Sequence, residues 1–162
     1  MSEKLLELGK KAPLFKLSNQ DAKEVSLKQL LDTHEYVVIY FYPKAMTPGC
    51  TTQACGIRDY KTEFKKAKVA VVGLSPDPVP KLKKFVDKYT LNFDLLSDED
   101  HKVTSSYGAW GKKKMMGVSF DGVHRVTFIL DKKGMIRQVF KKVTTKTHHD
   151  DVLKAISELV VE

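Results

Sequence analysis

The two cysteines of this 162-residue sequence lie in one segment, which runs from Tyr40 to Asp59. Cys50 directly follows Thr47-Pro48-Gly49. Thr is favoured as the N-cap of a helix and Pro as its first residue, so this order predicts Cys50 in the first helical turn. In that turn, backbone N–H groups and the positive end of the helix dipole favour the thiolate, which is the reactive form of cysteine. The pattern therefore predicts a reactive thiol at Cys50 rather than an inert, buried one.

The second cysteine, Cys55, follows Cys50 by five residues, and this spacing limits how the two thiols can combine. On a regular helix their Cα atoms are about 8.7 Å apart, whereas a disulfide requires less than about 7 Å. A Cys50–Cys55 disulfide thus requires part of the helix to unwind. Gly56 is expected to ease this step, because glycine weakens helices. In the alternative interpretation, Cys55 is an unreactive buried residue and a partner protein supplies the second thiol.

The spacing Pro43-x-x-x-Thr47-x-x-Cys50 resembles the active-site signature of the peroxiredoxins. The second cysteine, five residues later, resembles their Q-type subfamily, also called bacterioferritin comigratory protein. Further blocks resemble this family in the same order, so that the resemblance covers nearly the whole chain: 91–101, 107–111 and 124–131.

The resemblance implies a thiol-dependent peroxidase. The thiolate of Cys50 would attack hydrogen peroxide or an organic hydroperoxide and become a sulfenic acid. Cys55 would resolve this sulfenic acid as an intramolecular disulfide, which thioredoxin or a similar dithiol would reduce. No cofactor and no metal ion takes part in this chemistry.

The resemblance also implies roles for three other residues. The hydroxyl of Thr47 would contact the thiolate and the peroxide, in addition to capping the helix. Pro43 would shield the thiolate from water, although a plain strand terminator is an equal interpretation of this proline. Arg125 would stabilise negative charge on the sulfur and on the peroxide oxygens. Arg58 is the competing arginine, but it lies eight residues after Cys50 and hence about 12 Å further along the helix axis.

The elements that position these residues can be predicted from hydrophobic patterns. The apolar run from Val37 to Tyr42 indicates a buried central strand. A helical pattern follows from Thr47 to about Ala67, and a second apolar strand runs from Val69 to Leu74. A strand, a helix and a strand at this spacing are typical of a βαβ unit with parallel strands.

The rest of the chain is predicted to complete an α/β domain. We expect an N-terminal β-hairpin, a short edge segment, a loop, a second hairpin and a last helix, at residues 13–27, 93–96, 108–122, 126–140 and from 147 onwards, respectively. Patterns alone indicate only the α/β class. Together with the resemblance, they predict a thioredoxin-like fold, with a central mixed β-sheet flanked by helices, as a single domain over residues 1–162.

Two other functions are compatible with parts of the sequence. The net charge of +8 suggests a basic binding module, but the lysines are spread in pairs and triplets, which is typical of solvated surfaces. We therefore expect no nucleic-acid partner. A thiol–disulfide oxidoreductase on the same fold would require Cys-x-x-Cys, whereas this chain has four residues between its cysteines.

The N-terminal residues and the length of the apolar runs predict where in the cell the protein works. Residues 1–5 lack the apolar region of a secretory signal. No apolar run approaches the ~20 residues that span a membrane. The sequence thus predicts a cytoplasmic protein without membrane contact, and the resemblance implies a monomer.

Overall fold

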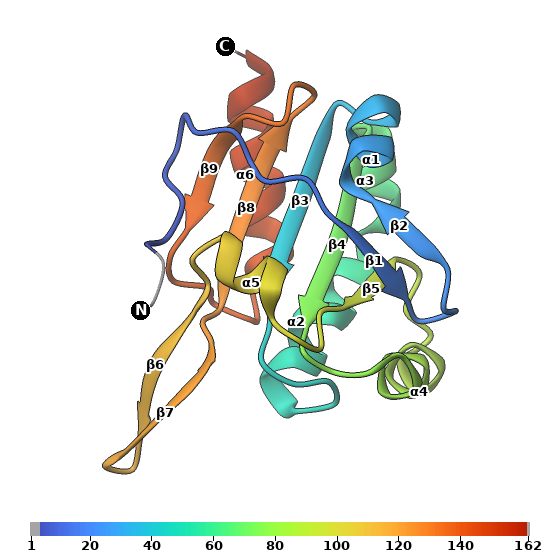
Figure 1. Ribbon diagram of the computed structural model, residues 1–162. Coiled ribbons are helices and arrows are strands. Elements are labelled where there is room, and N and C mark those ends of the chain that lie inside the picture. The colour runs from blue at the N-terminus through green and yellow to red at the C-terminus, as the bar shows by residue number, and fades with distance from the viewer. Residues whose placement is uncertain (1–3, 162) are drawn as a thin grey trace.

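Strand β3 (Tyr36–Phe41) lies inside a seven-stranded β-sheet in the computed structural model, which describes residues 4–161 (Figure 1). The strand order is β2-β1-β5-β4-β3-β8-β9. The other strands of this sheet are β1 (Lys16–Asn19), β2 (Glu24–Ser26), β4 (Val69–Ser75), β5 (Asp94–Ser97), β8 (Val126–Asp131) and β9 (Ile136–Phe140). Residues 1–3, on which part of the predicted absence of a secretory signal rests, lie outside the described range.

The sheet is mixed, because β3 pairs parallel with β4 and antiparallel with β8. Successive side chains of a strand point to opposite faces. The even-numbered and odd-numbered side chains of β3 accordingly enter two separate apolar clusters, one on each face of the sheet. Both clusters are buried, which is why the whole strand sequence is apolar.

Helices cover both faces of the sheet (Figure 1). The even-numbered residues of β3 pack with side chains from α2 (Pro48–Asp59), α3 (Lys61–Lys66), α4 (Val79–Tyr89) and α6 (His148–Val161). The odd-numbered residues pack with side chains from α1 (Leu27–Thr33) and, at the edge of the cluster, α5 (Lys102–Ser106). This architecture confirms the predicted mixed sheet with flanking helices and an N-terminal hairpin.

The predicted single helix from Thr47 to Ala67 is wrong at one point, because the chain breaks it at Tyr60 into α2 and α3. Tyr60 has φ −106° and ψ 21°. The side-chain amide of Asn92 donates a hydrogen bond to the carbonyl of Arg58 (3.1 Å), so this carbonyl has a partner outside the helix. The ring of Tyr60 meanwhile packs on the imidazole of His149 in α6. Tertiary contacts thus favour the break.

The segment predicted as a loop over residues 108–122 is instead a β-hairpin, formed by β6 (Trp110–Met115) and β7 (Val118–Val123). Its two strands project from the body of the molecule (Figure 1). The turn residues Met116 and Gly117 have φ values of 52° and 80°. Positive φ at both central residues is the geometry that matches the twist of a two-residue hairpin.

The predicted edge segment at residues 93–96 is also wrong, because β5 lies inside the sheet. It pairs with β4 on one side and with β1 on the other, where Ser18 lies opposite Ser97. The N-terminal hairpin therefore covers an edge that β5 would otherwise expose.

Candidate active site

The first turn of α2 holds Cys50, just beyond the end of β3. Thr47 is the N-cap, with extended backbone angles, and its carbonyl accepts the N–H of Thr51 at 2.9 Å. Pro48 opens the helix, so that Cys50 is its third residue. This is the placement that the sequence predicts. The thiol is free and nearly fully buried, with 1% of Cys50 exposed.

The guanidinium of Arg125 contacts this sulfur from the neighbouring strand. Arg125 directly precedes β8, which pairs with β3 so that Val126 lies opposite Phe41. Nη2 of Arg125 donates to Sγ of Cys50 at 3.0 Å, and its Nη1 donates to Oε1 of Gln53 at 2.9 Å. A permanent cation that donates a hydrogen bond to sulfur favours the thiolate.

The guanidinium of Arg125 lies close to the backbone at Gly49. A Cβ atom on Gly49 would lie 3.1 Å from Nη2 of Arg125. To accommodate a side chain at this position, the guanidinium would have to shift by a few tenths of an ångström. This close approach explains the glycine between the helix-opening proline and the cysteine.

The competing arginine is engaged elsewhere. Nη1 of Arg58 donates to the carbonyl of Tyr89 at 2.6 Å, and its Nε donates to Asp59 at 2.9 Å. Of the two arginines that the sequence left as candidates, the structure thus places Arg125 at the sulfur of Cys50.

Behind Arg125, a buried chain of polar side chains continues to the last helix. Nε2 of Gln53 lies 3.2 Å from Nδ1 of His148, and Nε2 of His148 lies 2.8 Å from Oγ1 of Thr127. Gln53 and Thr127 are fully buried, and His148 is 2% exposed. Burial lowers the pKa of His148 to about 4, so its imidazole is neutral near pH 7.

Sequence reasoning missed this buried chain. Only Gln53 carries a local signal, since it lies three residues after Cys50 and hence on the same helix face. His148 and Thr127 are brought to it by tertiary structure.

Lys113 of β6 was missed as well. Its Nζ donates to the carbonyl of Val123 at 2.8 Å. Burial, and to a smaller extent the charge of Arg125, lowers the pKa of Lys113.

The two remaining predicted residues lie in the connection between β3 and α2. The hydroxyl of Thr47 donates to the carbonyl of Lys44 at 2.8 Å, and its side chain makes no capping hydrogen bond to α2. The expected side-chain cap is therefore wrong, although the backbone of Thr47 is the N-cap. Pro43 is half-buried at the start of this connection.

The second thiol, Cys55, lies on the same uninterrupted helix as Cys50 and is half-buried and free. Directly after it, Gly56 packs against the imidazole of His149, and a Cβ atom at this position would overlap that ring. Glycine at position 56 thus has a packing role that the sequence did not reveal.

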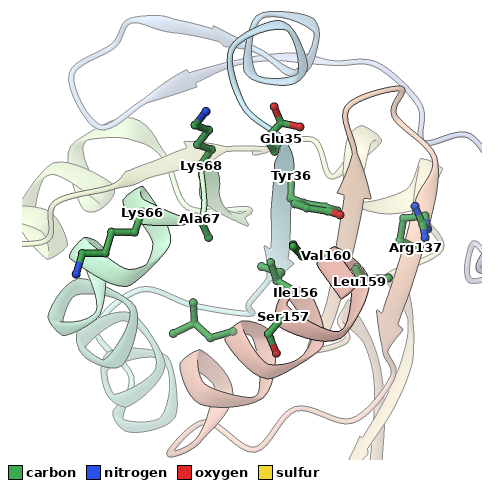
Figure 2. A pocket seen from close by; sticks show the side chains of 11 residues that line it. Glu35, Tyr36, Lys66, Ala67, Lys68, Arg137, Ile156, Ser157, Leu159 and Val160 are labelled. Carbon is green, nitrogen blue, oxygen red and sulfur yellow. The ribbon is translucent and has the colours of Figure 1, made fainter. Parts of the chain in front are cut away.

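Other features of the described surface do not coincide with this site. A surface pocket of about 770 Å³ lies between α3 and α6, near Tyr36 at the opposite end of β3 from Cys50 (Figure 2). Residues 4–161 contain no group of three or more His, Cys, Asp or Glu residues that fits a metal ion. Within the same range, no helix has both the length and the apolar character to cross a membrane.

Comparison with known proteins places the chain in a family. Residues 8–139 match the AhpC/TSA family. The chain is 50% identical to peroxiredoxin Bcp of Escherichia coli over 153 residues, which are 94% of this chain and 97% of the relative. The chain belongs to the peroxiredoxins of the AhpC/TSA family. A peroxiredoxin is a thiol-dependent peroxidase, and that is the function of this chain.

Solved structures of peroxiredoxins have the same fold. Peroxidoxin BcpB of Mycobacterium tuberculosis superimposes with a TM-score of 0.84 at 33% identity, covering 95% of this chain and 98% of that one. The bacterioferritin comigratory protein of Xanthomonas campestris, studied for its alkyl peroxide reduction activity, gives a TM-score of 0.83 at 33% identity, with 90% and 91% covered. The predicted thioredoxin-like fold and Q-type resemblance are thereby confirmed.

Proposed function

We propose that Cys50 is the nucleophile of this peroxidase and that Cys55 resolves its oxidised form. The Cys50 thiolate attacks one oxygen of a hydroperoxide, the O–O bond breaks, and the other oxygen leaves as hydroxide or alkoxide and takes up a proton. Sulfur is oxidised to a sulfenic acid, while hydrogen peroxide is reduced to water or an organic hydroperoxide to its alcohol. The single observation that carries this proposal is the 3.0 Å hydrogen bond from Arg125 to a cysteine in the first turn of a helix.

Arg125 and Thr47 are proposed to bind the reacting oxygens. The guanidinium already touches the sulfur, so it also lies beside the O–O bond of a peroxide that approaches this sulfur, where negative charge develops. The proton of the Thr47 hydroxyl is engaged by Lys44, which leaves its oxygen lone pairs to accept the O–H of a hydroperoxide. Pro43, half-buried beside this connection, limits the access of water to the thiolate.

Resolution by Cys55 is proposed to require unwinding of α2. The thiol of Cys55 attacks the sulfenic sulfur of Cys50, and a disulfide and one water molecule form. Both cysteines lie on one regular helix, on which a spacing of five residues separates the Cα atoms by about 8.7 Å. The first two turns of α2 must therefore open before the sulfurs meet.

A dithiol protein of the thioredoxin type is proposed to reduce this disulfide and return both thiols. We further propose that the chain works as a monomeric, single-domain enzyme of residues 1–162 in the cytoplasm.

Mass spectrometry after one equivalent of hydrogen peroxide tests the assignment of the two thiols. The wild type should lose two hydrogens as it forms an intramolecular disulfide. Cys55→Ser should gain one oxygen at position 50, and Cys50→Ser should remain unmodified and lack peroxidase turnover. Oxidation and turnover that persist in Cys50→Ser would assign the nucleophile to another residue.

A further inference from the structure

The hydrogen bonds behind Arg125 can be satisfied in only one arrangement of protons. Arg125 only donates, so the Gln53 atom that faces it at 2.9 Å must be the acceptor Oε1. The other amide atom, Nε2, is then a donor and points to Nδ1 of His148 at 3.2 Å. Nδ1 must therefore accept, which places the proton of the neutral imidazole on Nε2. That N–H donates to the hydroxyl oxygen of Thr127 at 2.8 Å.

We propose that His148 and Thr127 are positioning residues of the peroxidase reaction, which hold the Gln53 amide in the orientation that keeps Arg125 on the sulfur of Cys50. This inference rests on the proposed roles of Cys50 and Arg125. It assigns two residues, from α6 and β8, that touch neither the sulfur nor the peroxide.

Loss of the acceptor at His148 would act directly on Arg125. A proton on Nδ1 would face the donor Nε2 of Gln53, and two donors repel. The amide relieves this contact by turning over, but its NH₂ group then faces the guanidinium of Arg125. Because Gln53 and His148 are buried, water cannot easily reach the contact between them to compensate. Either orientation thus leaves one donor pair opposed, and in the turned orientation Nη1 of Arg125 loses its acceptor on Gln53.

The surroundings of His148 keep the imidazole neutral. Burial is the largest cause of its lowered pKa. The charged or titratable groups that act on it are Asp151 and His149 on its own helix and Arg125, while the ring of Tyr40 from β3 packs edge-on at 5.5 Å. Asp151 favours the protonated form, whereas His149 and Arg125 oppose it. The acceptor that Gln53 needs is accordingly present over the pH range in which a cell works.

The experiment measures the rate of single-turnover oxidation of Cys50 by hydrogen peroxide, in the full chain with Cys55→Ser. Arg125→Ala should slow this step by about 10²- to 10³-fold, as does removal of one donor to a developing oxyanion. His148→Leu removes the acceptor and should slow it by roughly 10-fold or more, because a misplacement of ~1 Å costs up to ~10²-fold.

Two further variants separate positioning from packing. His148→Asn places an amide oxygen close to the position of Nδ1, so it should restore most of the rate that His148→Leu loses. Thr127→Val keeps the volume but removes the acceptor for Nε2–H, which allows the proton to move to Nδ1, and it should be slower than the wild type.

His149→Leu is the matched control, because it alters the neighbouring buried imidazole on the same helix without touching Gln53. It should oxidise at the wild-type rate.

A double variant decides the route by which His148 acts. If it acts through Arg125, then His148→Leu should have no further effect in the Arg125→Ala background. Multiplicative losses would overturn the proposal, and so would a wild-type rate in His148→Leu while Arg125→Ala is slow. A wild-type rate in Arg125→Ala would instead remove the proposed function of Arg125 itself. If His148→Leu does not fold, then equal rates for Thr127→Val, His148→Asn and the wild type would overturn the proposal.

Discussion

Arg125 donates a hydrogen bond from Nη2 to Sγ of Cys50 at 3.0 Å, although 75 positions separate the two residues in the chain. The contact depends on the antiparallel pairing of β3 with β8, which sets Val126 opposite Phe41. The chain continues from β3 into α2, which carries the sulfur of Cys50, and Arg125 directly precedes the neighbouring strand β8. The reactive pair thus lies where two paired strands of the sheet meet the segments that carry Cys50 and Arg125.

Cys55→Ser should leave the first chemical step intact, because Cys55 takes no part in the attack on the peroxide. Turnover with thioredoxin should fall sharply, and excess peroxide should drive Cys50 to the sulfinic acid, since no thiol traps the sulfenic acid. Rapid-quench mass spectrometry and a coupled thioredoxin assay measure the two effects. Thioredoxin-driven turnover at the wild-type rate would make Cys55 a bystander.

Oxidation should unwind the first half of α2 and little else. Amide hydrogen exchange should become faster over residues 50–56 in the disulfide form, while β3, β8 and α6 keep their protection, because opening one or two turns is a local event. Peptide-level exchange on both redox forms measures this difference. Equal protection over these residues, in protein whose disulfide is confirmed by mass, would contradict the helical spacing argument.

Gly56→Ala should destabilise the protein, although the same change in an exposed helix would stabilise it by about 1 kcal/mol. The added methyl group overlaps the imidazole of His149, which is buried and packed on Tyr60, and such overpacking costs about 1–3 kcal/mol. Denaturant unfolding measures the change. In a His149→Ala background the room is restored, so there Gly56→Ala should raise the free energy of unfolding. Stabilisation in the wild-type background would show that α6 moves aside freely.

Stability should depend on pH through His148. Its pKa is about 4 in the folded chain and about 6.5 when unfolded, so between these values the unfolded chain binds more protons. The free energy of unfolding should therefore fall as the pH is lowered through this window, by about 2 kcal/mol between pH 7 and pH 5. Urea unfolding at both pH values, compared with His148→Asn, isolates this contribution. If the wild type and His148→Asn lost equal stability between these pH values, the pKa of His148 would not be lowered in the folded chain.

The position of Cys50 could be predicted from the sequence because its signals are local. Thr47 and Pro48 mark the helix start, and the apolar run before them marks the strand. Arg125 was found only through the family resemblance, since its contact with Cys50 depends on strand pairing. The contact between Gln53 and His148 joins residues 95 positions apart and left no pattern to detect.

Two further features of the fold could not be predicted from the sequence, each for a physical reason. The break at Tyr60 follows from contacts with Asn92 and His149, which no local pattern records. The hairpin of β6 and β7 is exposed along most of its length, so it lacks the alternation of apolar and polar residues that predicts a half-buried strand. Only its Met116-Gly117 turn carries a local signal.

The packing of α6 against α2 also orders events during protein synthesis. A ribosome makes α2, which carries Cys50, well before α6, which carries His148. Until residues 148–156 emerge, the apolar side chains of α2 lack the partners Val152, Ala155 and Ile156, and Gln53 lacks its acceptor. A nascent or prematurely terminated chain therefore carries both thiols without the completed site.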